Sequence, residues 1–94
     1  MDFSSVHNIH ESAVFEAVLA AAPNYPGLSS SPDLLADVAC VALNRVPARY
    51  IRHDVDLAFF LTERERIDNE RSIRDAVEHA FGFVQARHAM AARR

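Results

Sequence analysis

Four prolines, all in the first half of the chain, limit where this sequence can form helices. Pro23 and Pro26 lie in a nine-residue run that also holds one glycine and three serines, so a helix cannot continue through it. Pro32 follows a serine cap and suits the first position of a helix, whereas Pro47 disfavours helical geometry at Val46. The prolines therefore predict a helix over residues 5–22, a loop at 23–31 and a second helix from 32 to 44 or 45.

Both predicted helices carry an apolar face. In the first helix, Val14 and Val18 recur at helical spacing, and His7 and Glu11 project onto the same face near the start. We expect the beginning of this helix to be exposed to solvent, with a functional role or a dimer contact as the alternative. The second helix is apolar nearly all round, which predicts a central position. It carries one narrow polar stripe, which consists of Asp33, Asp37 and Asn44 beside a packed Cys40. These polar side chains must contact water, a partner or a ligand.

The second half of the chain predicts one further helix with a clear beginning. Thr62 and Glu65 form a capping box, and the mixed charges from 63 to 75 indicate a solvated helix face on which Glu70 precedes Arg74 by four residues. An apolar stripe at helical spacing follows, and the tail 89–94 is expected to fray.

The stretch before that helix, residues 47–61, stays ambiguous. As an extended chain it would place Tyr50, Arg52, Asp54 and Asp56 on one side, whereas residues 55–61 could equally form a short buried helix.

These patterns predict an all-α fold: one small helical domain spanning 1–94, with three to five helices and a possible short extended segment after the central helix. Half of the residues are hydrophobic, which is ample for so short a chain and suggests extra apolar surface that a homodimer would bury.

Charge and composition also exclude some classes of protein. The net charge of −3 and the pI of about 5.9 argue against nucleic-acid binding through a broad positive field. The single cysteine cannot form a disulfide within one chain. No signal peptide and no apolar run of membrane-spanning length is evident, so we expect a cytoplasmic protein with no membrane contact.

The most unusual stretch is residues 44–53, which carries three arginines and a tyrosine but no acidic residue. Arginine can fork onto phosphate oxygens or bond the edge of a guanine, and a tyrosine ring can stack on a base. The alternative is a structural turn, in which the arginines pair with Asp54, Asp56 or a helix end and Tyr50 packs in the core. On spacing alone, the structural turn is the simpler interpretation.

The run from Asp37 to Tyr50, DVACVALNRVPARY, resembles the signature of the late competence development family ComFB. That signature is an apolar helix reading D-x-A-x-x-A-L-N followed by L-P-P-R-Y. The segment Asn8–Glu11 resembles the amino-terminal segment of the family, and the likeness in layout extends from about residue 9 to 84. Here Val46 and Ala48 replace a leucine and a proline of the pattern. Cysteines that several members carry before this helix are replaced by PGLSSS, which removes an implied zinc site.

This resemblance implies a compact helical fold, a dimer and, in some members, a receptor for cyclic dinucleotides such as cyclic di-GMP. Matched by position, Asn44, Arg49 and Tyr50 are the implied ligand-binding residues. Proximity adds four more candidates, namely Arg45, Arg52, Asp37 and Asp54. The expected ligand is cyclic di-GMP rather than cyclic di-AMP, with an unidentified downstream protein as a further partner. No catalytic residue, metal or cofactor is expected, and the chain is not expected to be an enzyme.

Three other hypotheses follow from the sequence. The first is a nucleotide-independent adaptor between proteins in competence or motility regulation, since Tyr and Arg are favoured interface anchors. The second is a metal-dependent phosphohydrolase, because His53 and Asp54 resemble the paired ligands of such enzymes, which require further ligands on other helices. In the third, His7, His10 and Glu11 hold a metal.

Overall fold

The computed structural model describes residues 1–92, and within them the chain is helical except for short connections and a two-stranded ribbon. The helices are α1 (Glu11–Ala21), the 3-10 turn η1 (Ala22–Asn24), α2 (Pro26–Ser29), α3 (Pro32–Arg45), α4 (Asp54–Phe60) and α5 (Glu63–Ala92). The strands β1 (His7–Asn8) and β2 (Tyr50–Ile51) pair antiparallel, with Asn8 opposite Tyr50. The predicted all-α class, the helix count and the extended segment after the central helix are confirmed.

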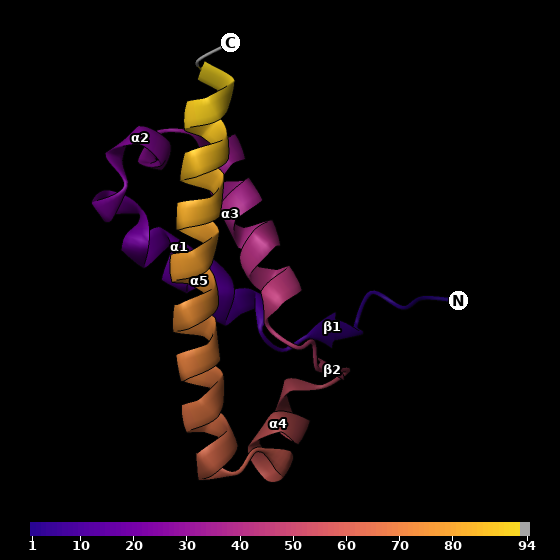
Figure 1. Cartoon of the computed structure of the whole chain (residues 1–94). Helices are drawn as coiled ribbons and strands as arrows, with labels where there is room; N and C mark the ends of the chain where they lie inside the picture. Colours follow the sequence, from indigo (N-terminus) through magenta and orange to yellow (C-terminus); the bar gives the residue numbers. More distant parts are fainter. Residues whose placement is uncertain (93–94) are drawn as a thin grey trace.

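Helix α5 is the long central element of the fold, against which the other helices of the core pack. It runs along the whole structure, and α1 and α3 pack against its middle and upper part, while α4 and the ribbon lie near its beginning (Figure 1). The core between the three helices is built from Val14 and Val18 of α1, Val38 and Ala42 of α3, and a stripe of α5. That stripe comprises Ile73, Ala76, Val77, Ala80, Phe81 and Val84.

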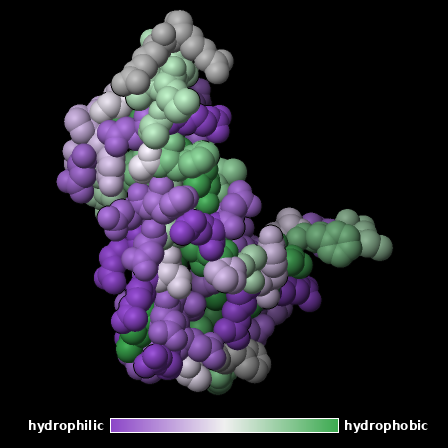
Figure 2. Space-filling model, viewed as in Figure 1, coloured by the Kyte–Doolittle hydropathy of each residue, from purple (hydrophilic) through white to green (hydrophobic). Residues whose placement is uncertain are grey.

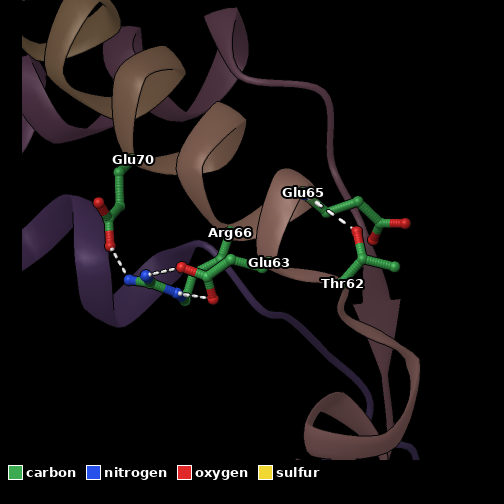
Figure 3. Close-up of polar contacts among 5 residues, drawn as sticks. All are labelled: Thr62, Glu63, Glu65, Arg66 and Glu70. Carbon is green, nitrogen blue, oxygen red and sulfur yellow. Dashed lines mark hydrogen bonds and ion pairs between the residues drawn. The ribbon is translucent and has the colours of Figure 1, made fainter.

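The helix beginnings follow the local sequence. The Ser31 hydroxyl accepts the N–H of Leu34 at 3.2 Å, and Pro32 takes the first helical position. At α5 the Thr62 hydroxyl accepts the N–H of Glu65 at 3.1 Å, and the Arg66 guanidinium bridges Glu63 and Glu70 (Figure 3). The Thr62 half of the predicted capping box is therefore present, whereas the Glu65 carboxylate bonds Arg49 instead of closing the box. Glu70 pairs with Arg66, one turn before it, rather than with Arg74.

Three predicted boundaries were wrong. The first helix begins at Glu11, not near residue 5, because the preceding residues pair with Tyr50–Ile51 and the Asn8 side chain accepts the N–H of His10. The 23–31 loop contains η1 and α2, with Leu28 buried against the core. Helix α5 stays helical through Ala92, so the expected fraying is not seen at 89–92, and residues 93–94 lie outside the described part.

Residues 47–61, for which the sequence left strand and helix open, form a short strand and then a short helix. Tyr50 and Ile51 are extended, and α4 then begins at Asp54, one residue before the predicted short helix. Strand alternation therefore stops before Asp54, and the predicted continuous row from Tyr50 to Asp56 is wrong. Local charge explains the change, because Asp54 and Asp56 occupy the first turn of α4, where the helix dipole favours carboxylates.

The surface is unevenly divided between polar and apolar areas. Hydrophilic residues cover most of the face seen in Figure 2, whereas hydrophobic residues of the amino-terminal arm project away from the body. Within residues 1–92, no helix combines the length and the hydropathy needed to cross a bilayer.

Candidate functional site

The candidate site is the segment 44–54, here called the Arg–Tyr segment, which connects α3 to α4. Its first anchor is Val46, which is buried and whose N–H still bonds the Ala42 carbonyl at 3.2 Å. Pro47 follows, and Val46 accordingly takes an extended conformation that ends α3. The segment thus leaves the central helix at a fixed point and turns toward the amino-terminal strand.

The second anchor is Asn8, a buried residue on β1. Its side-chain oxygen accepts the N–H of Arg49 at 3.2 Å and the N–H of His10 at 3.3 Å. The Arg49 carbonyl in turn accepts the N–H of Ile9 at 2.9 Å. One amide therefore holds the backbone on both sides of the ribbon. The sequence pattern does not mark Asn8 as a site residue; its one signal is its place in the amino-terminal segment that resembles ComFB.

Arg49 extends from this anchored backbone toward the start of α5. Its Nη1 donates to Glu65 Oε2 at 2.9 Å, and both side chains remain more than two-fifths exposed. The capping residue Glu65 therefore also orients the arginine predicted to bind ligand, a role that the sequence did not indicate. Exposed pairs of this kind contribute about 0–1 kcal/mol to stability, so an anion could replace the carboxylate at small cost.

The other members of the segment point into solvent. Tyr50 is 65% exposed, which excludes the core-packed tyrosine of the structural-turn interpretation. Arg45 and Arg52 are also exposed, and neither makes an ion pair with any side chain that the structure describes. The exposed Asn44 amide donates to the Cys40 carbonyl at 2.9 Å, one turn back along α3. Apart from the bond from Arg49 to Glu65, the arginines of the segment are thus available to a ligand.

The structure separates the two acidic candidates from one another. Asp37 lies two turns before Asn44 on α3 and lines a hollow of about 200 Å³ against the last turns of α5, with Arg87 and His88 among its neighbours. Asp54 lies at the start of α4 and accepts from the His7 ring at 2.9 Å. The arginines, Tyr50 and Asp54 therefore share one region, and Asp37 is outside it.

Two histidines flank the site in opposite environments. The His7 ring bonds the Ser5 carbonyl and the Asp54 carboxylate, both at 2.9 Å, and these acceptors raise the pKa of His7 above 6.5. His10 is buried, and burial lowers its pKa below 6.5, with a smaller contribution from the positive charge of Arg49. The bond from His7 to Asp54 thus joins β1 to α4 and favours the charged imidazole, whereas the burial of His10 favours the neutral one.

Titration of the histidine ring protons by NMR should therefore give His7 a midpoint above 6.5 and His10 a midpoint below it. The stability contributed by His7 is complete below pH 6.5 and is lost as the pH rises through its folded-state pKa. The stability contributed by the neutral His10 is complete above pH 6.5 and is lost as the pH falls through the folded-state pKa of His10. Asp54→Asn should move only the His7 midpoint, and back toward 6.5. A His10 midpoint above that of His7 would contradict this assignment.

The residues proposed as metal ligands do not come together as a set. Within residues 1–92, no group of three His, Cys, Asp or Glu side chains is placed to hold a metal ion. His53 precedes α4 and is exposed, and its neighbour Asp54 bonds His7. His7 lies on the ribbon rather than on α1, so it does not share a helix face with Glu11.

In chemical terms, the segment offers forked cationic donors and one flat aromatic face on a backbone that the rest of the fold holds in place. Guanidinium groups suit phosphate oxygens and guanine edges, and a phenol ring suits stacking. An anion with planar rings matches both features at once.

Comparison with known proteins bears on the whole chain. The family model described as "Late competence development protein ComFB" matches residues 7–88, which includes both strands, the Arg–Tyr segment and most of α5. Comparisons with curated proteins and with solved structures give no significant match.

Proposed function

Because the chain belongs to the family of the late competence development protein ComFB, we propose that it is a regulatory binding protein rather than an enzyme. In this proposal it acts in the cytoplasm as a homodimeric receptor for a cyclic dinucleotide, cyclic di-GMP in preference to cyclic di-AMP. It passes the signal to a downstream protein.

One observation carries the proposal: an exposed Tyr50 stands beside exposed arginines on a backbone fixed by a buried amide. A flexible loop with the same residues would lose conformational entropy on binding, and the anchored ribbon reduces that loss. Arg49 and Arg52 would bind the phosphates or a guanine edge, and Tyr50 would stack on a base. Arg45 would add positive charge, and Asn44 would bond a base edge.

The local charge supports an anionic ligand even though the chain as a whole is acidic. The three arginines at 45, 49 and 52 meet one partner carboxylate, that of Glu65, among the side chains that the structure describes. Asp54 is occupied by His7 instead. A phosphodiester ring, with two negative charges, would take the place of Glu65 at Arg49 and neutralise two of the three arginine charges.

Isothermal titration calorimetry with cyclic di-GMP and cyclic di-AMP at about 100 μM protein tests this function directly. We expect saturable binding, weakened about 30-fold in Arg49→Ala through loss of a charge-assisted contact. The matched control is Arg71→Ala, which removes the same charge from an exposed position in the first third of α5. Equal weakening of binding in both variants would show that the loss reflects the overall charge of the protein and not a contact of Arg49. If neither nucleotide gives heat on titration, the receptor function is refuted.

A further inference from the structure

Among the apolar surfaces that the fold leaves exposed, one lies between two helices of the core. Helices α1 and α3 enclose a groove of about 470 Å³, here called the α1/α3 groove, and no residue of α5 lines it. Its lining residues are Phe15, Val18, Leu19, Leu35, Ala36, Ala39, Cys40, Leu43 and Asn44. On α3 these residues recur in pairs four apart, so they form one straight stripe along the helix. No residue of α5 covers this stripe, on which Ala36 and Cys40 are exposed.

The exposed fractions show how much apolar surface is involved. Leu19 is 66% exposed and Phe15 is 47% exposed, although Val14 and Val18 of the same helix are buried. Cys40, predicted from sequence to be a packed residue, is exposed in the same groove. Large apolar side chains that are exposed together beside a groove are typical of an interaction site.

The chain exposes more surface than a compact monomer of its size. The chain exposes 6840 Å², about 1,400 Å² more than a compact monomer of its mass. Its radius of gyration is 15.1 Å, against about 12 Å for a compact domain of this length. A stable interface buries about 800 Å² on each partner, so one such contact fits within the surplus.

The chemistry of the groove suits a contact between two copies of this chain. A two-fold contact places identical surfaces face to face, so any charge within it would meet its like. No charged residue lines the groove, whose polar members are Cys40 and Asn44. The side chains at the bottom of the groove, Ala36 and Ala39, are small, whereas the large side chains of Phe15 and Leu19 project beside them. Projecting side chains of one copy can therefore occupy the small-residue floor of the other.

We infer that two copies of the chain pair through their α1/α3 grooves. This inference rests on the homodimer of the proposed function and specifies its surface. Asn44 belongs both to the groove and to the Arg–Tyr segment, so the pairing surface adjoins the proposed ligand site. Ligand binding would then act next to the interface, where it can alter how tightly the two copies associate.

Sedimentation velocity at 5–50 μM tests the surface. We expect twice the chain mass of 10.5 kDa for the unmodified protein. Leu19→Asp should raise the dimer dissociation constant about 100-fold or more, because the charge enters the interface twice. The matched control is Met90→Asp, at an exposed position of equal accessibility on α5, which should leave the dimer intact. Helical circular dichroism of both variants should match that of the unmodified protein.

The single cysteine gives a second readout that needs no substitution. Cys40 lies in the groove, so its reaction with a thiol reagent should slow as the protein concentration rises. A monomer at 50 μM, an intact dimer in Leu19→Asp, or dissociation by Met90→Asp instead would each overturn the inference. A monomer that still binds cyclic di-GMP through Arg49 would refute this surface alone. A dimer that binds neither nucleotide would refute the receptor function and leave the surface standing.

Discussion

Phe81→Ala should lower the free energy of unfolding by about 4 kcal/mol, the largest effect we expect from one substitution in this chain. Phe81 is fully buried on α5, and its ring stacks on that of Tyr25, with centroids 4.2 Å apart and planes within 5°. The ring fills the space between α5 and the connection that follows α1. Its removal leaves a cavity there and also removes the aromatic stacking.

The effect is large relative to the stability of such a domain, which is about 5–15 kcal/mol in total. Phe83→Ala is the matched control, because Phe83 lies two residues further along the same helix and is about half exposed. Its cost should stay below about 1 kcal/mol. Chemical denaturation followed by circular dichroism measures both. Equal losses in the two variants would show that α5 packs on α1 through a different face.

Asn8→Ala should lower the free energy of unfolding by about 3 kcal/mol and also abolish the ligand binding proposed above. The substitution removes the acceptor for two backbone N–H groups, those of Arg49 and His10, at a position that is only 7% exposed. The His10 donor then stays buried without a partner, at a cost of about 1–3 kcal/mol, and the part-buried Arg49 donor also loses its acceptor. The ribbon that holds Arg49 and Tyr50 loses its central connection.

The control for this effect is Asn24→Ala, which removes an exposed amide at the end of η1 and should cost less than about 0.5 kcal/mol. Denaturation gives the stability and calorimetry with cyclic di-GMP gives the binding. A variant as stable as the unmodified protein that binds the nucleotide normally would show that Asn8 does not hold the Arg–Tyr segment. A stable variant without binding would assign Asn8 to the ligand itself.

The sequence could predict the helices whose signals are local. Ser31 and Pro32 begin α3, Thr62 begins α5, and Pro47 ends α3, because each acts through its own dihedral angles or a hydrogen bond within one turn. The signature around Arg49 and Tyr50 also identified the family, which the model over residues 7–88 confirmed. These features need no knowledge of what lies elsewhere in the chain.

Features that depend on distant residues could not be predicted in the same way. The first helix lost its expected beginning because residues 7 and 8 pair with Tyr50 and Ile51, more than forty positions away. Glu65 should have closed a capping box by local rules, yet its carboxylate binds Arg49. In both cases a long-range contact competes with a local preference worth about 1 kcal/mol, and the long-range contact prevails.

The sequence by itself determined that the chain is helical, where its central and last helices begin, and which family it belongs to, because capping, proline geometry and a contiguous motif act over a few residues. Only the tertiary structure decided that Asn8 holds the candidate site, that Asp37 lies apart from it, and that the groove of Leu19 and Cys40 remains open. Helical periodicity shows which residues share a face, but not which neighbour, if any, covers that face.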